Sequence, residues 1–88
     1  MIGQEITNVT LTANTETTID YPSAIQLADI QNQGPGDVYL SWRKTAMIGD
    51  ANCIRLIAGD SYEIRSSGPF TKTSFISVGT PFVQAVTR

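Results

Sequence analysis

Apolar and polar residues alternate with a period of two along most of the chain. In one run Val38, Leu40 and Trp42 share one side, while Tyr39 and Ser41 share the other. The apolar members of the other alternating runs are Val9, Leu11 and Ala13; Ile54, Leu56 and Ala58; Tyr62 and Ile64; Ile76 and Val78; Val83 and Ala85. This period is the signature of β-strands with one buried face.

Clusters of turn-forming residues separate these runs. They are Asn14-Thr15, Tyr21-Pro22, Gly34-Pro35-Gly36, Gly49-Asp50, Gly59-Asp60, Ser67-Gly68-Pro69 and Gly79-Thr80-Pro81. Short strands at such regular spacing are typical of a sandwich or barrel. We therefore predict an all-β fold, a single small antiparallel β-sandwich or barrel that is jelly-roll-like, with about seven to eight short strands and little helix.

Residues 22–34 fit two patterns. Ser23 followed by Gln26 matches a helix capping box, and Gly34 suits a helix C-cap. Ile25 and Leu27 also alternate, however, and both flanking segments read as strands, so a strand is favoured over a short helix for residues 23–33. A short helical turn is also compatible with residues 43–51, a long connection expected to cross one end of the barrel.

The chain has 88 residues, and we expect one β-domain over 1–88, with residues 1–5 as a possible N-terminal arm. Domains this small commonly need a disulfide, a metal or self-association to be stable. Cys53 is the single cysteine and there is no histidine, which argues against an internal disulfide and against zinc or iron–sulfur centres. Self-association is the remaining way to stabilise so small a domain, so a homo-oligomer is expected.

Charge is sparse, with six Lys or Arg against eight Asp or Glu and a net charge of −2. Only Arg43-Lys44 forms a basic pair, so nucleic acid is not an expected partner. No apolar run approaches the ~18 residues of a membrane helix, and the N-terminus does not resemble a signal peptide. We expect no membrane association and synthesis in a cytoplasm, where a lone thiol stays reduced.

The dipeptide Gly-Asp recurs at 36–37, 49–50 and 59–60. A phosphate loop would need a Lys and a Ser or Thr that open a helix, whereas here Asp37 precedes a strand. Calcium binding is the stronger functional alternative, because Asp37, Asp50 and Asp60 offer oxygen ligands. Calcium loops, however, gather several acidic residues within a few positions, and here each Asp stands alone. A tight turn accounts for the motif, because Gly takes positive φ and Asp bonds its own backbone.

No catalytic constellation stands out, and we expect no enzyme, cofactor or metal site. Without histidine, an activated nucleophile would need a carboxylate or Lys as its base, and no such pairing is marked. Cys53 begins an apolar strand and reads as a small buried hydrophobe. The five acids Asp20, Asp29, Asp37, Asp50 and Glu63 include no pair that is singled out for glycoside hydrolysis.

Four apolar residues are candidate partner or oligomer contacts: Ile2, Ile6, Phe70 and Phe82. Phe70 and Phe82 each follow a proline just after a turn, so they either cap the core or form an apolar patch that a partner covers. Ile2 and Ile6 lie outside a strong strand pattern, in an arm over a neighbour or in a frayed end. Trp42 is expected in the core, with an exposed carbohydrate platform as the alternative.

Two stretches, "IQNQGPGDVYLSW" and "CIRLIAGDSYEIR", precede an alternating C-terminus, "TSFISVGTPFVQAV". Over residues 24–86 this arrangement resembles the small all-β virion proteins of tailed bacteriophages, namely capsid decoration (cement) proteins and head-fibre or adaptor domains. The resemblance implies a compact β-sandwich or barrel, often trimeric, that sits on capsid capsomers or at a vertex and stabilises the shell. It supplies no catalytic residues.

We therefore expect a non-enzymatic viral structural protein, located in the virion after synthesis in the host cytoplasm. It would bind and stabilise the assembled capsid as an oligomer, with a trimer favoured, through the major capsid protein or other virion proteins. The alternative is a carbohydrate-binding or adaptor β-module of a phage tail, a fibre or a secreted protein. A small enzyme or a calcium-binding domain is a third possibility.

Overall fold

A computed structural model describes the backbone of residues 5–51 and 53–87, and these residues form strands and loops without a helix. The strands are β1 (Glu5–Thr10), β2 (Thr17–Asn32), β3 (Val38–Ser41), β4 (Ile54–Leu56), β5 (Ser61–Ile76) and β6 (Phe82–Thr87). The all-β class is confirmed, and so is the strand in place of a helix over residues 23–33, since residues 23–32 belong to β2. Residues 43–51 contain bends and a turn, so the helical turn considered there is wrong.

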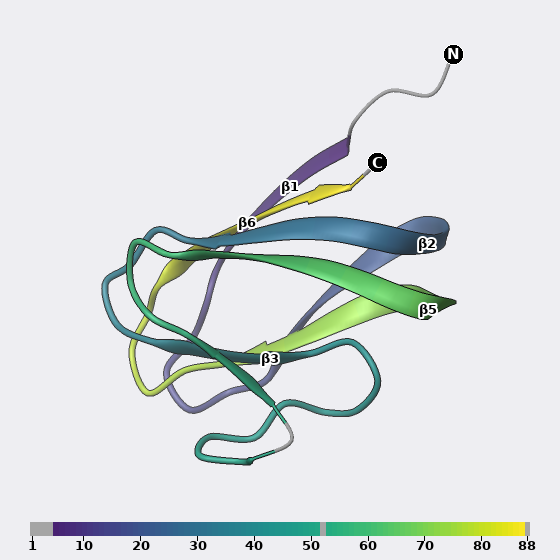
Figure 1. The fold of residues 1–88 in the computed structure, drawn as a ribbon. Coiled ribbons are helices and arrows are strands. Elements are labelled where there is room, and N and C mark those ends of the chain that lie inside the picture. The colour runs from purple at the N-terminus through teal and green to yellow at the C-terminus, as the bar shows by residue number, and fades with distance from the viewer. Residues whose placement is uncertain (1–4, 52, 88) are drawn as a thin grey trace.

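The two long strands, β2 and β5, run antiparallel and bend together near their middles (Figure 1). Residues 17–20 of β2 pair with 72–75 of β5, whereas residues 27–31 pair with 61–65, and the register shifts between these blocks. Pro22 and Pro69 lie in this corner, where a residue without an N–H is tolerated because the ladder is interrupted. Two of the expected turns, Tyr21-Pro22 and Ser67-Gly68-Pro69, are therefore bends inside continuous strands.

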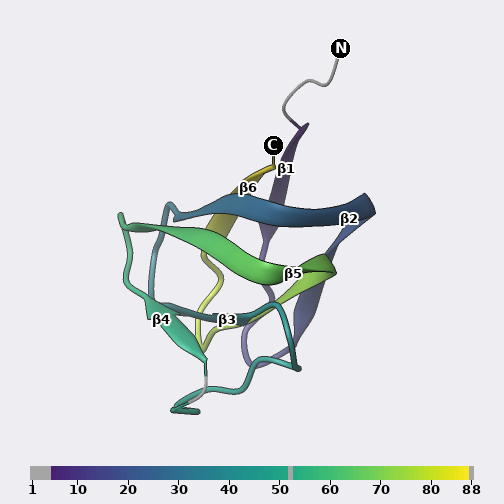
Figure 2. The same cartoon turned by 45° about the vertical axis from the view of Figure 1, so that its right-hand side comes forward.

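The strand order β1-β6-β2-β5-β3-β4 is that of one sheet, which the two bends fold into two layers (Figures 1 and 2). The first layer holds β1, β6 and the halves of β2 and β5 that pair over 27–31 and 61–65. The second holds the other halves with β3 and β4. Four short strands and two halved long ones make eight straight segments. This is the expected jelly-roll sandwich.

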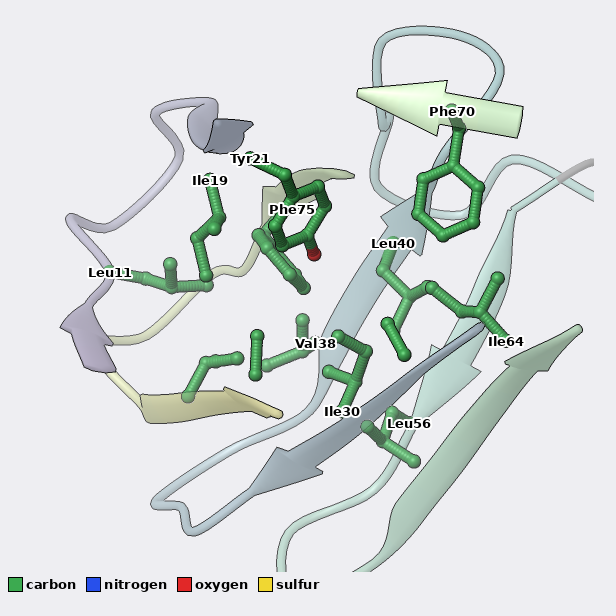
Figure 3. Packing of buried hydrophobic residues seen from close by; sticks show 13 residues of the cluster. Leu11, Ile19, Tyr21, Ile30, Val38, Leu40, Leu56, Ile64, Phe70 and Phe75 are labelled. Carbon is green, nitrogen blue, oxygen red and sulfur yellow. The ribbon is translucent and has the colours of Figure 1, made fainter. Parts of the chain in front are cut away.

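The core lies between the layers and draws its buried residues from β2 to β6 and from Leu11, while Val9 of β1 packs against it (Figure 3). Its buried residues are Leu11, Ile19, Tyr21, Ala28, Ile30, Val38, Leu40, Leu56, Ile64, Phe70, Phe75, Val83 and Ala85. Seven of the fifteen positions predicted to face inward are among them, and four more, Val9, Trp42, Ile54 and Tyr62, are partly buried against the cluster. Ala58 was also predicted to face inward, but it is exposed. Burial of these side chains on both layers is the main favourable term in folding.

Over residues 75–78 the predicted inward-facing positions are wrong by one residue. Ile76 and Val78 were predicted to face inward, but Phe75 and Ser77 are fully buried and Val78 is 64% exposed. Phe75 fills far more of the core than Ile76 would. Ser77 is buried at little cost because its Oγ donates to the Asp37 carbonyl at 2.6 Å and accepts from Gly79 N at 3.1 Å.

The Gly-Asp motifs at 49–50 and 59–60 are the last two residues of β-turns. Asp50 N donates to Met47 O at 3.2 Å, and Asp60 N donates to Ile57 O at 3.1 Å. Gly49 (φ 76°) and Gly59 (φ 89°) occupy the third turn position, where a type II turn requires positive φ. The turn interpretation of the motif is confirmed at both places.

Candidate interaction surface

The outer face of the first layer carries neutral side chains from the paired strands β1 and β6. Directly opposed residues in antiparallel strands share a face. Val9 and Val83 form one opposed pair that packs on or within the core, so the pairs that alternate with them point outward. We call these six residues the β1–β6 face: Ile6 with Val86, Asn8 with Gln84, and Thr10 with Phe82.

The β1–β6 face mixes apolar and amide groups and has no ionisable side chain. Ile6 is 58% exposed, while Val86 and Phe82 are half-buried. Between them Gln84 Nε2 donates to Asn8 Oδ1 at 3.0 Å. Covering these six side chains removes no water from a charge of β1 or β6, and the centres of protein interfaces are depleted in charged residues for that reason. Asp29 of β2, which stands opposite Val86, is the charged neighbour at the border of the face. Ile6 and Phe82, two of the predicted contacts, thus share one face about 13 Å apart along the strands.

An open strand edge borders this face. In the described sheet, β1 stands at one end and pairs only with β6, and β4 stands at the other and pairs only with β3. An edge strand exposes unpaired N–H and C=O groups to which another chain can add a strand. β1 has six residues and lacks the Lys or Pro that commonly blocks such pairing.

Of the two other predicted contacts, Phe70 does not join the β1–β6 face. Phe70 is buried in the core, with its ring edge-on to Tyr21 at 6.0 Å (Figure 3). It therefore follows the core-capping alternative, because the bend of β5 turns it inward. Ile2 lies outside the described residues.

Trp42 packs against the core as predicted and also borders the surface. Its ring stacks on Tyr62 with centroids 6.2 Å apart and lies 6.4 Å from Phe70. The indole is half-buried and its Nε1 has no hydrogen-bond partner in the described part of the chain. Beside it a hollow of about 380 Å³ opens between the end of β3 and the bend of β5. The alternating pattern of the sequence does not reveal this hollow.

Two of the three turn aspartates, Asp37 and Asp50, form ion pairs. Asp37 Oδ2 accepts from Arg55 Nη2 at 2.6 Å, and Asp50 Oδ2 accepts from Lys44 Nζ at 2.5 Å. The hydrogen bond from Lys44 to Asp50 raises the pKa of that amine above its usual value.

Among residues 5–51 and 53–87 no three or more Cys, Asp or Glu gather closely enough to hold a metal ion. Nor do these residues include a helix suited to crossing a membrane.

No family model and no curated protein sequence matches the chain. Solved structures that resemble its fold include the following two. A cupin-2 domain containing protein from Shewanella frigidimarina NCIMB 400 aligns with a TM-score of 0.60 and 13% identity over 100% of this chain and 74% of its own. A de novo designed double-stranded β-helix aligns with a TM-score of 0.58 and 21% identity over 94% of this chain and 96% of its own.

These identities are low enough that the likeness concerns the fold alone. The chain has the jelly-roll, or double-stranded β-helix, architecture. Folds of this kind serve many unrelated functions, so function has to be argued from the surfaces described above.

Proposed function

We propose that this protein is a non-enzymatic structural protein of a virion, which binds the assembled capsid as a homo-oligomer and reinforces it. The observation that carries the proposal is the neutral β1–β6 face beside the open edge of β1. A face without charges next to an unpaired strand suits a permanent contact with another protein surface.

A second copy of the same chain is the simplest partner for the β1–β6 face. Small domains have thin stability margins, and burying Ile6, Phe82 and Val86 against another copy adds apolar contact that one chain lacks. Closed symmetric oligomers cover such a patch on every copy. A trimer is favoured by the resemblance to phage decoration proteins.

The virion assignment rests on the resemblance of residues 24–86 to small all-β proteins of tailed bacteriophages. The jelly-roll architecture is compatible with it, because viral capsid proteins commonly use this fold. An oligomer on a repetitive shell also gains avidity from many weak contacts, so no single strong site is needed.

The test is the oligomeric state together with capsid binding. Light scattering should give about 28 kDa, three times the 9.5 kDa chain, and the protein should sediment with shells of the virus that encodes it. Ile6→Glu places a charge in the β1–β6 face and should yield monomer. Val78→Glu is the matched control, since Val78 is similarly exposed but lies in the β5–β6 loop. A wild-type monomer that ignores capsids contradicts the proposal.

A further inference from the structure

The hollow beside Trp42 combines aromatic, cationic and hydroxyl-bearing side chains. Trp42 and Phe70 form its aromatic part, Arg43 and Lys72 its cationic part, and Ser66 and Thr71 add hydroxyl groups. Its volume of about 380 Å³ falls at the lower end of the range for small-molecule sites. It lies at the bend of β5, away from the β1–β6 face.

The charges that line this hollow are all positive. Arg43 Nη2 donates to Ser66 Oγ at 3.3 Å, which connects the end of β3 with the bend of β5. Lys72 makes no ion pair within the described chain, although Asp20 stands opposite it in the ladder. Glu16 lines an adjoining hollow and accepts from Ser74 Oγ at 2.5 Å. Arg43 and Lys72 line that adjoining hollow as well, so two exposed cations stand near one hydrogen-bonded carboxylate, and this excess of positive charge favours an anion.

The uncharged lining favours a ring that carries hydroxyl groups. Trp42 is half-buried and held by its stack on Tyr62, so its exposed part is a rigid apolar surface. Phe70 is buried beside it. Sites of this kind combine aromatic walls with a few polar groups that fix the ligand's orientation. The hydroxyls of Ser66 and Thr71 can each donate and accept.

We propose that this hollow binds an acidic saccharide, a pyranose ring that carries a carboxylate. The carboxylate lies between Arg43 and Lys72, the apolar side of the ring lies against Trp42, and the ring hydroxyls face Ser66 and Thr71. This site is independent of the β1–β6 face, so the proposed function and this inference can fail separately.

Trp42 is the single tryptophan, so its fluorescence reports on the hollow directly. The probes are D-glucuronate, D-glucose as the same ring without the charge, and acetate as the charge without the ring. Glucuronate should shift the emission of Trp42 and bind at least about tenfold more tightly than either control, and 0.5 M NaCl should weaken its binding because exposed charges are screened. Equal binding of glucose or acetate, or no binding of glucuronate, overturns the proposal.

Substitutions locate the site. Lys72→Gln and Arg43→Gln should each weaken glucuronate binding about tenfold, since each removes one charge-assisted contact. Arg65→Gln is the matched control, because Arg65 is an exposed cation that pairs with Glu63 in the first layer. Circular dichroism confirms that each variant is folded. If Arg65→Gln weakens binding as much as Lys72→Gln does, the effect comes from net charge and the site is refuted.

Discussion

Asn32 Nδ2 donates a hydrogen bond to the carbonyl oxygen of Leu56 at 2.9 Å and so joins the end of β2 to β4, 24 residues further along the chain. The same amide donates to Gly36 O at 2.8 Å, and Asn32 Oδ1 accepts from Gly34 N at 2.9 Å. The side chain is 1% exposed, so these bonds replace water for three backbone groups. One buried amide thus shapes the loop that leads into β3.

Removing this amide should be costly. Asn32→Ala leaves the carbonyls of Gly36 and Leu56 and the N–H of Gly34 without their side-chain partner, and a buried group that loses its bond costs ~1–3 kcal/mol. We expect the free energy of unfolding, measured with urea, to fall by about 3 kcal/mol. Asn8→Ala, at an exposed amide, should change it by less than about 0.5 kcal/mol. Equal effects would contradict this role of Asn32.

The turn glycines should be sensitive through their backbone conformation alone. A Cβ added at Gly59 would meet no atom within 4 Å, but its φ of +89° is unfavourable for other residues. Gly59→Ala should therefore lower the free energy of unfolding by about 1–2 kcal/mol. Gly68→Ala is the control, because that position is equally open and its φ lies outside the left-handed region. Thermal unfolding of both variants provides the measurement, and similar melting temperatures would argue against a strained turn.

Tyr21 should make the fold sensitive to alkali. Burial raises the pKa of its hydroxyl above 10, and the hydrogen bond with Thr73 Oγ1 at 2.7 Å lowers it by a smaller amount. Since the folded state favours the neutral phenol, this contribution to stability is complete below the unfolded pKa near 10 and is lost as the pH rises through the folded pKa.

The variant Tyr21→Phe should be less stable at pH 7 by about 1–2 kcal/mol, because Thr73 loses its buried partner. Between pH 9 and 11, however, it should lose less stability than the wild type does. Urea unfolding across this pH range measures both proteins, and parallel profiles for wild type and Tyr21→Phe would refute the prediction.

Trp42 contributes packing but leaves its buried N–H unpaired by the described residues. Trp42→Phe keeps an aromatic ring beside Tyr62 and Phe70 and removes that donor. The smaller ring loses contact area, which destabilises the fold, but the variant no longer buries an unpaired N–H, which stabilises it. We therefore expect the loss in unfolding free energy to stay below about 1 kcal/mol. Phe75→Ala, at a fully buried ring, should cost about 3–5 kcal/mol. A large loss for Trp42→Phe in chemical denaturation would show that the N–H has a partner.

The candidate surfaces were only partly visible in the sequence. Phe82 was singled out as an aromatic residue just after a turn and Ile6 as an apolar residue outside a strong strand pattern, and pairing places both on the β1–β6 face, with Ile6 inside β1. Phe70 looked equivalent to Phe82, yet it enters the core because it lies within the bend of β5. The hollow could not be found, since Arg43 and Lys72 are 29 positions apart and come together only when β5 folds over.

The period of two and the spacing of the turn residues determined, without any coordinates, that the chain forms a small antiparallel β-sandwich. Local pattern has this power because side chains alternate along every strand. It cannot say which of two alternating sets faces inward when both contain apolar residues, as at 75–78. It also cannot distinguish a turn between strands from a bend within one. Only the tertiary structure decided these points, because they depend on side-chain volume and on pairing partners that lie far apart in the chain.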